Sequence, residues 1–472
     1  MTKEILKNKI FKIISETAQE LNVRAFVIGG YVRDFHLGKS SKDIDIVVEG
    51  KGIKLALATA KKVGNPKVTV FKSFGTAMFK FEGMEIEFVG ARKESCNRNS
   101  RKPIVEEGTL KEDQDRRDFT INALALSLQK ENFGDMIDPF GGINHMKKKL
   151  LITPLDPHIT YSDDPLRMMR AIRFSAQLGF DIEKDSFKAI IINSDRLKIV
   201  SMERILTEFN KIMLTPVPSI GLKLLYESNL LHQFFPEMIK LHGVKIIDGK
   251  GHKDNFYHTL QVVDNISKNT NNVWLRWAAL LHDIAKPATQ RFDKKNGWTF
   301  HGHEALGARW VPKIFKRLKL PLDAKMKYVQ KLVNLHLRPI VLSKEIVTDS
   351  AVRRLLFDAG DDIDDLMLLC EADITSKNSE KVKKYLNNFK LVRIKLKDIE
   401  ERDNIRNFQP PVSGEDIIKA FNLKPSKQIG EIKDAIKDAI IEGLIPNKRN
   451  AAIKFMKEKA AEFGLTLINE IK

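Results

Sequence analysis

The stretch VIGGYVRDFHLGKSSKDIDIVV, residues 27–48, constrains the fold more than any other part of the chain. Asp43 and Asp45 alternate with isoleucines in a predicted buried strand. Because side chains two residues apart on a strand point to the same face, these carboxylates should lie close together and repel each other. A divalent cation removes that conflict, and Mg²⁺ takes carboxylate oxygens together with substrate phosphates. The stretch therefore predicts a magnesium site on a sheet.

Two glycines before the acidic pair favour phosphate binding. Gly29 and Gly30 have no side chains, so a phosphate can approach the backbone closely. Arg33 and Asp34 follow at the start of a predicted helix, whose N-terminal amides also favour an anion. The alternative is a surface turn rich in Gly and Asp, because an isolated Asp-x-Asp pattern is common. The Gly-Gly and Arg-Asp pairs together favour the metal and phosphate interpretation.

The charge balance favours a nucleic-acid partner. The 472-residue chain has 80 Lys+Arg against 61 Asp+Glu, which leaves a net charge of +19. Such a field attracts polyanions, of which nucleic acid is the usual one, although some enzymes are simply basic. Cys96 and Cys370 lie far apart, so a disulfide framework is not expected and a reducing compartment fits. No apolar run approaches the roughly 20 residues of a membrane span, so we expect a cytoplasmic protein without membrane contact.

The hydrophobic pattern predicts a multidomain chain of the α/β plus all-α class. Residues 1–148 combine an amphipathic helix at 4–20 with several strand-like runs, which predicts a mixed α/β domain. From residue 149 onward, apolar residues recur at three- and four-residue intervals, as in helices. We expect a helical neck at 149–215, a helical body at 216–390 and a helical tail at 391–472.

The pattern GG-x-V-R-D followed by D-x-D resembles the nucleotidyltransferase superfamily that includes DNA polymerase beta. It is most similar to the bacterial (class II) tRNA nucleotidyltransferases, the CCA-adding enzymes, and their poly(A) polymerase relatives. Four more motifs follow in the family's order: DQDRRDFTINALA (113–125), DPFGG (138–142), DDPLRMMRAIRF (163–174) and MERILTEF (202–209). The resemblance implies a polymerase-beta-like head, an elongated helical neck, body and tail, and template-independent addition of C and A to tRNA 3′ ends.

This resemblance implies CTP and ATP as substrates and pyrophosphate as the leaving product. Asp43 and Asp45 would be the catalytic ligands of Mg²⁺, with two ions clamping the attacking and leaving oxygens. Glu87 is a candidate third carboxylate, because strand alternation would aim it at the same pocket; a solvated strand residue is the alternative. Poly(A) polymerases and CC-only or A-only tRNA enzymes share most motifs and stay open.

The motif RRDFTIN contributes a second part of the expected nucleotide site. By resemblance, Arg116 and Arg117 help to bind the triphosphate and ribose, with Asp118 and Asn122 beside them. Guanidinium groups suit phosphate oxygens because they bind them in a bidentate manner. The alternative is an Arg-Arg-Asp cluster of ion pairs at a domain seam.

The stretch DDPLR contains a pair that matches the edge of a base. Asp164 and Arg167 are three apart on a predicted helix that starts at residue 163 or 164, and a carboxylate accepts hydrogen bonds while a guanidinium donates them. Cytosine and adenine offer an amine beside an unprotonated ring nitrogen, whereas uracil and guanine would be mismatched. In the resembled family this pair selects C and A; a simple helix cap is the alternative for Asp164. Arg170 and Arg173 continue the face toward phosphates.

Two positions depart from the family's pattern. Asp163 stands where the family usually has Glu, and His145-Met146 follow DPFGG where an Asp-Leu pair is usual. Because the family's carboxylate is associated with movement between head and neck, that coupling is not assigned to this chain. The polar segment 94–114, which we expect to be an irregular loop, matches a flexible loop that affects addition of the terminal A.

A second constellation lies in the predicted body and resembles the HD-domain metal sites of phosphohydrolases. His282 and Asp283, at the end of an apolar helix, would be costly to bury without a cation or partner. Imidazole and carboxylate together suit Mn, Fe, Co, Ni or Zn, with Mg²⁺ as the other candidate ion at this site, and structural hydrogen-bonded histidines are the alternative. The expected ligands are His258, His282, Asp283 and Asp373, with His303 and His336 as candidate ligands of a second metal.

The partner implied is tRNA, and no obligate protein partner is indicated. Lysines between 377 and 397, together with Lys448-Arg449, would contact backbone phosphates without reading sequence. Two other classes stay open: an HD phosphohydrolase whose head only binds RNA, and a non-catalytic RNA chaperone.

Overall fold

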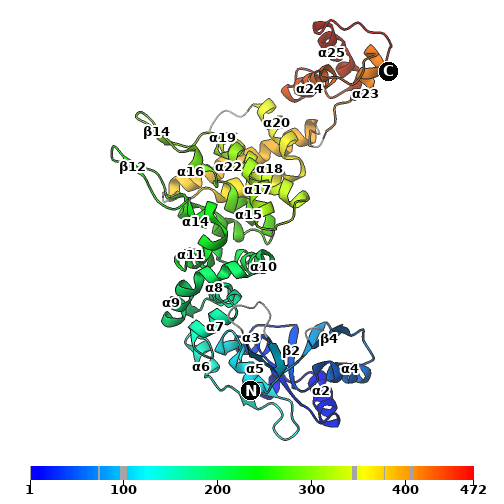
Figure 1. Ribbon diagram of the computed structural model, residues 1–472. Coiled ribbons are helices and arrows are strands. Elements are labelled where there is room, and N and C mark those ends of the chain that lie inside the picture. The colour runs from blue at the N-terminus through cyan, green and yellow to red at the C-terminus, as the bar shows by residue number, and fades with distance from the viewer. Residues whose placement is uncertain are drawn as a thin grey trace. The chain divides into compact units, whose positions relative to one another are not determined.

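The computed structural model describes residues 2–72, 75–95, 104–342, 348–376, 378–403, 405–406 and 408–471. The chain forms two compact units, Met1–Pro236 (unit 1) and Glu237–Lys472 (unit 2). Unit 1 contains a sheet with helices, and unit 2 is mainly helical (Figure 1). The predicted fold class, an α/β head followed by helical parts, is confirmed, whereas the finer four-part division stays a prediction. Among the described residues, none of the helices has both the length and the apolar composition of a membrane span.

Unit 1 is built on a mixed sheet. In the described part of the chain its seven strands have the order β3-β4-β5-β2-β1-β8-β9. Strands β2 and β5 run parallel, and the other neighbours run antiparallel. The strands are β1 (Arg24–Ile28), β2 (Asp43–Glu49), β3 (Thr69–Phe71), β4 (Thr76–Phe81), β5 (Met84–Gly90), β8 (Ala125–Ser127) and β9 (Met136–Ile137). The centre of the sheet is apolar because β1 and most of β2 are buried on both faces.

Two helices pack near the sheet's N-terminal strands. α2 (Lys9–Glu20) contacts β1, and α4 (Gly52–Lys62) packs on β4 and β5. Glycine is required where α4 meets β5, because a Cβ on Gly52 would lie 2.9 Å from the backbone N of Gly90. The single helix expected at 4–20 is wrong. A short α1 (Thr2–Ile5) comes first, and Asn8 then caps α2 by accepting a hydrogen bond from the Ile10 N–H.

The expectation of an irregular loop at 94–114 is wrong for the described residues. β6 (Arg92–Ser95) pairs antiparallel with β7 (Ile104–Glu107), and α5 (Leu110–Asp115) follows. Thr109 and Glu112 form a capping box, in which each side chain accepts a hydrogen bond from the other's backbone N–H. This box explains why a polar stretch starts a helix. The rest of the segment, residues 96–103, lies outside the described residues, as does Cys96.

The remaining elements of unit 1 are helices and one short parallel strand pair, β10–β11. They are η2 (Thr120–Asn122), α3 (Gly30–His36), α6 (Gly142–Lys147), β10 (Leu150–Leu151), α7 (Pro157–Asp163), α8 (Leu166–Leu178), β11 (Asp181–Ile182), α9 (Lys184–Asn193), η3 (Ser194–Ile199), α10 (Met202–Met213), α11 (Pro218–Glu227) and α12 (Leu230–Phe234). α8 begins at Leu166, two or three residues later than expected: Asp163 ends α7, and Pro165 is the N-cap of α8.

Unit 2 packs its helices around α15, in which every residue from Leu275 to Leu281 is buried. Its helices are α13 (Pro236–Ile239), α14 (Asn255–Ser267), α15 (Val273–Leu281), α16 (Lys286–Thr289), α17 (His303–Arg317), α18 (Ala324–Leu335), α19 (Leu337–Leu342), α20 (Asp349–Ala359), η4 (Gly360–Asp362), α21 (Ile363–Ala372), α22 (Ser379–Asp403), α23 (Gly414–Phe421), α24 (Lys427–Glu442) and α25 (Arg449–Glu462). Two short hairpins, β12–β13 and β14–β15, complete the unit.

Candidate active site and metal centre

The acidic pair of β2, Asp43 and Asp45, lies beside a second pair of carboxylates on the neighbouring strand β5. The parallel register places Asp43 opposite Glu85 and Asp45 opposite Glu87. All four residues line one cavity of about 520 Å³. Glu87 therefore lies in the same pocket as Asp43 and Asp45, as strand alternation predicted, and Glu85 is a residue that the sequence reasoning missed although it shares that alternation.

Burial and mutual repulsion act on these carboxyl groups. Burial raises the pKa of Asp45, which Arg117 opposes and the charge of Asp43 reinforces. Burial also raises the pKa of Glu87, and the charge of Asp45 adds to that shift. Negative charge gathered in a partly buried pocket is stabilised by a bound cation. The donor set, consisting of carboxylate oxygens alone, fits Mg²⁺.

The glycine turn lies directly in front of these carboxylates. Gly29 connects β1 to α3 with a φ of +82°, a left-handed conformation that favours glycine. A Cβ at this position would lie 3.0 Å from Nη1 of Arg117 and 3.6 Å from Oδ2 of Asp45. A side chain would therefore fill the space between the arginine and the carboxylate. The neighbouring Gly30 and, from α3, Arg33 and Asp34 line the same cavity.

Arginines form another part of the cavity lining. Arg117, Arg170 and Arg173 line it together with Asp118 and Asn122. Asp118 accepts hydrogen bonds from Arg170 Nε at 2.7 Å and from Asn122 Nδ2 at 2.9 Å. Burial alone would raise the pKa of Asp118, but the charge of Arg170 and these hydrogen bonds outweigh it, so the pKa is lowered. Asp118 thus stays ionised and fixes Arg170.

Two buried carboxylates that the sequence reasoning did not single out hold the other arginines. Asp113, fully buried, accepts hydrogen bonds from Nε of Arg116 at 3.1 Å and from Nε of Arg117 at 3.0 Å. Glu208 on α10 lies 2.7 Å from Nε of Arg173. Both residues lie within motifs already noted in the sequence, Asp113 in DQDRRD and Glu208 in MERILTEF. The acidic residues of these motifs could therefore have been predicted as partners of the arginines. Arg116 is held at Asp113 and does not line the cavity.

A single aromatic ring organises three of these guanidinium groups. Phe174, on α8, lies 4.0 Å from the Arg173 guanidinium carbon, 5.1 Å from that of Arg33 and 5.4 Å from that of Arg170, measured to the ring centroid. The ring face attracts cations, so it keeps three like charges near one another. Arg33 also donates to Asn122 Oδ1 at 2.6 Å. Motif reasoning did not identify Phe174, because an aromatic residue at helical spacing is normally core.

The pair expected to select the base, Asp164 and Arg167, lies outside the lining of the cavity. Asp164 precedes α8 and accepts a hydrogen bond from the Leu166 N–H at 3.1 Å, so it caps the helix instead of sharing its face. Arg167 donates to the backbone carbonyls of Thr160 and Arg116. Neither Asp164 nor Arg167 lines the cavity that contains the aspartates.

His145, which replaces the family's usual Asp, connects α6 to η2. Its Nδ1 lies 2.9 Å from Oγ1 of Thr120, at the start of the 3₁₀ turn that carries Asn122. Burial lowers the pKa of His145, and Asp138 opposes that shift. The neutral imidazole is therefore the form that contacts Thr120.

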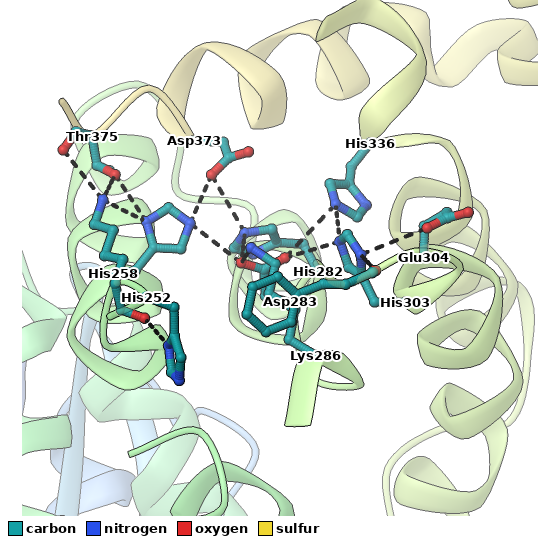
Figure 2. Close-up of polar contacts among 12 residues, drawn as sticks. His252, His258, His282, Asp283, Lys286, His303, Glu304, His336, Asp373 and Thr375 are labelled. Atoms are coloured by element: carbon teal, nitrogen blue, oxygen red, sulfur yellow. Dashed lines mark hydrogen bonds and ion pairs between the residues drawn. The ribbon is translucent and has the colours of Figure 1, made fainter. Parts of the chain in front are cut away.

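The second constellation converges in unit 2 (Figure 2). Asp283 Oδ2 lies 3.3 Å from His258 Nε2 and 3.2 Å from His282 Nε2. Asp373 Oδ1 lies 2.9 Å from His258 Nε2 and 3.5 Å from His282 Nε2. His258 lies on α14, while His282-Asp283 and Asp373 lie at the C-terminal ends of α15 and α21. The four expected ligands of the first metal therefore come together.

The two further histidines lie on the other side of the same aspartate. Asp283 Oδ1 is 3.2 Å from Nε2 of His303 and 3.9 Å from Nε2 of His336, and these two nitrogens are 3.3 Å apart. Asp283 thus connects two groups of potential ligands, His258–His282–Asp283 and Asp283–His303–His336. Within the described residues, these are the groups whose ligand atoms all lie within 4.8 Å of one another; the head carboxylates are spaced more widely.

Backbone carbonyls set the orientation of three of these imidazoles. Nδ1 of His282, of His303 and of His336 each lies 2.7 Å from the carbonyl oxygen three residues earlier, in Ala279, Phe300 and Val333. An Nδ1–H donated to a carbonyl leaves Nε2 as the free lone pair that a metal takes. Nε2 of His282 is buried and lies 3.2 Å from Oδ2 of Asp283, which Lys286 Nζ also approaches to 2.6 Å.

Charge in the cluster also favours a cation. Burial alone would lower the pKa of His282, but Asp283 and Asp373 outweigh it and raise that pKa to about 10. Burial and the neighbouring His282 lower the pKa of His336 to about 4. Without a bound cation, the imidazole of His282 is therefore protonated and supplies positive charge between the two aspartates; a bound metal would take the place of that proton. The imidazole of His336 stays neutral. Lys286 Nζ, 2.6 Å from Asp283 Oδ2, supplies part of that charge.

Comparisons with known proteins agree with both sites. Three family models match: "Poly A polymerase head domain" at residues 25–152, "Probable RNA and SrmB- binding site of polymerase A" at 179–241 and "HD domain" at 255–378. Fold and sites thus define a nucleotidyltransferase head of the poly(A) polymerase type followed by an HD domain. The chain belongs to the tRNA nucleotidyltransferase and poly(A) polymerase family, and the resemblance inferred from its motifs is confirmed.

Proteins named for different activities are similar in sequence to this chain. The "Multifunctional CCA protein" of Shewanella frigidimarina is 30% identical over 75% of this chain and 84% of its own length. The "A-adding tRNA nucleotidyltransferase" of Aquifex aeolicus is 42% identical over 39% of this chain, but this chain spans only 22% of that protein. A tRNA nucleotidyltransferase solved with a primer tRNA and an incoming ATP analog is 26% identical, with a TM-score of 0.56, over 81% of this chain and 99% of its own.

Proposed function

We propose that the protein adds C and A nucleotides to the 3′ end of tRNA from CTP and ATP, releasing pyrophosphate. The observation that carries this proposal is one cavity lined by carboxylates of two parallel strands and by Arg117, Arg170 and Arg173. Carboxylates for metal beside guanidinium groups for phosphates are the requirements of nucleotidyl transfer. A relative named as a multifunctional CCA protein supports tRNA as the acceptor.

Asp43, Asp45 and Glu87 would hold Mg²⁺ in this reaction. The bound metal supplies positive charge to the attacking and leaving oxygens of the in-line displacement. The raised pKa values of Asp45 and Glu87 support this assignment, because burial and then the neighbouring carboxylates raise them, and a bound cation would stabilise the ionised forms against both effects. Glu85, although in the same cavity, forms an ion pair with Lys80 at 2.7 Å and is already neutralised.

The chain's own cations would bind and orient the triphosphate. Arg117 is fixed by Asp113 and lies against the Gly29 turn, and Arg170 is fixed by Asp118. Fixed guanidinium groups hold phosphate oxygens without loss of side-chain freedom. With the α-phosphate oriented, the RNA 3′-oxygen forms the new P–O bond as the bond to pyrophosphate breaks.

Asp164 and Arg167 would select the base through their acceptor and donor groups. Arg167 is bound to backbone carbonyls of Thr160 and Arg116, so base reading requires it to exchange these carbonyls for a base edge. Asp164 Oδ1 stays bound to the helix start, while Oδ2 lies 3.5 Å from a guanidinium nitrogen of Arg204, so base reading would require Oδ2 to exchange Arg204 for the amine of C or A. Capping and base selection are therefore compatible in this residue.

The experiment that tests this proposal is extension of tRNA transcripts ending before the first C, after CC, or after CCA, with each NTP supplied singly. We expect CTP on the first substrate and ATP on the second. Addition of ATP alone, and only to the CC-ending transcript, would make the protein an A-adding enzyme, which the Aquifex aeolicus relative supports as the second candidate. Unlimited ATP addition to generic RNA would identify a poly(A) polymerase and overturn the proposal.

We further propose that the second constellation, which we call the HD cluster, binds a transition metal and can serve phosphoester hydrolysis. The HD cluster consists of His258, His282, Asp283, His303, His336 and Asp373. The ligand atoms of His258, His282 and Asp283, which all lie within 4.8 Å of one another, support binding, and nitrogen with oxygen donors suits Mn, Fe, Co, Ni or Zn. Phosphatase assays on the D43A/D45A double variant test this activity in isolation. Hydrolysis that survives in that variant and disappears in D283A would assign it to the HD cluster; hydrolysis absent from the wild type would remove it.

We assign tRNA contact to the tail and to α22, in a cytoplasmic location. α22 carries the lysines expected at 381–397, while Lys377 lies outside the described residues. Lys448 is exposed, whereas Arg449 forms an ion pair with Asp416 at 3.0 Å, so Lys448 is the better candidate for a phosphate contact. The isolated, buried thiol of Cys370 is consistent with a reducing compartment.

A further inference from the structure

Two antiparallel hairpins project from the same part of unit 2 (Figure 1). β12 (Ile246–Ile247) pairs with β13 (Lys250–Gly251), and β14 (Arg291–Asp293) pairs with β15 (Gly297–Thr299). The hairpins are joined, because Trp298 Nε1 donates to the Lys250 carbonyl at 2.9 Å and Lys250 Nζ donates to a carbonyl of the second hairpin at 3.0 Å. Residues 244–253 and 291–300 therefore form one surface, which we call the hairpin surface.

A row of aromatic rings crosses the hairpin surface toward the HD cluster. The rings are, in order, those of Phe292, Trp298, His252 and Phe300. Neighbouring centroids are 5.3, 5.4 and 5.7 Å apart, and all four side chains are half-buried. At the end of the row, Lys286 Nζ lies 5.6 Å from the Phe300 ring and 2.6 Å from Asp283 Oδ2. The row is thus continuous with an expected metal ligand.

The hairpin surface carries uncompensated positive charge. Its six cations are Lys245, Lys250, Lys253, Arg291, Lys294 and Lys295, against the two carboxylates Asp248 and Asp293. In the described structure none of the six has a carboxylate oxygen within 4.0 Å. The apolar side chain of Ile246 is 71% exposed among them. Exposed cations interleaved with rings require a partner that offers both negative charge and flat apolar faces.

We propose that the hairpin surface binds single-stranded RNA and leads its end to the HD cluster. Cations that follow phosphates and rings that stack on bases are the two components of single-strand recognition. Paired bases in a duplex are stacked on one another and do not offer their faces to side chains, so a duplex would use the cations alone. Lys253, 3.2 Å from Nδ1 of His258, and Lys286 would hold a terminal phosphate beside Asp283. This site is separate from the nucleotide-binding cavity of unit 1.

The location of binding is tested by photo-crosslinking. The full-length protein is irradiated with a single-stranded RNA of about 12 nucleotides, within the site size of single-strand binders, that carries 5-bromouridine. Mass spectrometry then assigns the crosslinked peptides. We expect crosslinks to the peptides containing Trp298 and His252. Crosslinks confined to peptides of unit 1, or equal crosslinking by a duplex of the same sequence, would overturn the proposal.

The contribution of charge is tested by a matched pair of double variants. K294E/K295E reverses two exposed cations of the hairpin surface, and K268E/K327E makes the same charge change at two exposed positions elsewhere in unit 2, the C-cap of α14 and a position within α18. Affinity for the RNA is measured by fluorescence anisotropy across a salt series. The affinity falls as salt rises, with a slope of log K against log salt of about −0.7 per phosphate contact on a single strand. We therefore expect K294E/K295E to make this slope less steep by about 1.4. Equal slopes in the two variants would contradict the proposal.

The contribution of stacking is tested at Trp298. Trp298→Ala is expected to weaken binding about fivefold or more, the low end of one base stack, whereas Trp298→Phe keeps a ring and should bind within about twofold of the wild type. Circular dichroism and thermal unfolding check that the variants are folded. If Trp298→Phe loses as much affinity as Trp298→Ala in folded proteins, the indole hydrogen bond to Lys250, and not stacking, is responsible, and the base-binding role is wrong.

Discussion

Asp45 and Glu87 lie opposite each other on the parallel strands β2 and β5, and burial raises the pKa of both. Two carboxylates from strands that are far apart in sequence thus share one pocket with Asp43. Their arrangement leads to the first two predictions.

Asp45→Asn is expected to lower nucleotide incorporation by roughly 10³-fold, because it removes a charged ligand of the metal that stabilises the reacting oxygens. The control is Asp135→Asn, which makes the same chemical change at an exposed turn of unit 1. Primer extension measures activity, and filter binding measures tRNA affinity. Loss of tRNA binding in parallel with activity would assign Asp45 to RNA contact instead of metal binding.

Glu87→Gln and Glu85→Gln form a matched pair on the same strand and in the same cavity. We expect Glu87→Gln to raise the Mg²⁺ concentration for half-maximal activity by about tenfold or more, since a ligand charge is lost. Glu85→Gln should leave that concentration within about threefold, because Glu85 is paired with Lys80. Magnesium titrations of the extension rate decide between them, and equal shifts would reject Glu87 as a specific ligand.

We expect the metal content of the protein to depend on His303 in the HD cluster and not on the nearby His301. His303 is buried beside Asp283, whereas His301 is exposed in the same HGH motif. His303→Ala should lower metal content measured by inductively coupled plasma mass spectrometry, and His301→Ala should not. Metal saturating at 100 times its Kd stabilises the folded state by about 2.7 kcal/mol, so chelation should lower the thermal midpoint of the wild type. An unchanged midpoint with full metal removal would contradict a structural contribution.

Asp118 predicts a specific pH dependence of stability. Its pKa in the folded protein lies below the ordinary value of an aspartate, so its contribution to stability is fully present above that ordinary value and is lost as the pH falls through the folded pKa. Asp118→Asn leaves Arg170 without its carboxylate and should destabilise unit 1 by about 3–5 kcal/mol at neutral pH. Thermal midpoints of wild type and variant should therefore converge only in strong acid. Convergence already near neutral pH would show that the Asp118 pKa is raised.

Base selection is tested by Asp164→Ala, scored as the ratio of CTP to UTP incorporation. A site that pairs each polar group of the correct base rejects the wrong base strongly, so losing the acceptor should lower that ratio by about a hundredfold. Asp181→Ala removes an exposed carboxylate of the same unit and should leave it unchanged. A slower but equally selective Asp164→Ala enzyme would assign the residue to helix capping alone.

The sequence was informative wherever the signal was local. Alternation on β2 and β5 predicted that Asp43, Asp45 and Glu87 share a face, whereas the HD cluster, whose residues lie far apart along the chain, was expected only through the family resemblance. Partners brought in by the fold were not predictable: Glu208 reaches Arg173 from α10, and Phe174 gathers guanidinium groups from two helices. Short-range capping was underestimated, as the Thr109–Glu112 box and the late start of α8 demonstrate.

Each of the imidazoles of His282, His303 and His336 is held by a carbonyl of its own chain segment, at the very end or start of a different helix. The lone pairs therefore converge only once α15, α17 and α18 have reached their native boundaries. A metal held by this cluster would therefore depend on the folded boundaries of three helices, and its binding free energy would add to the free energy that keeps these helices in place.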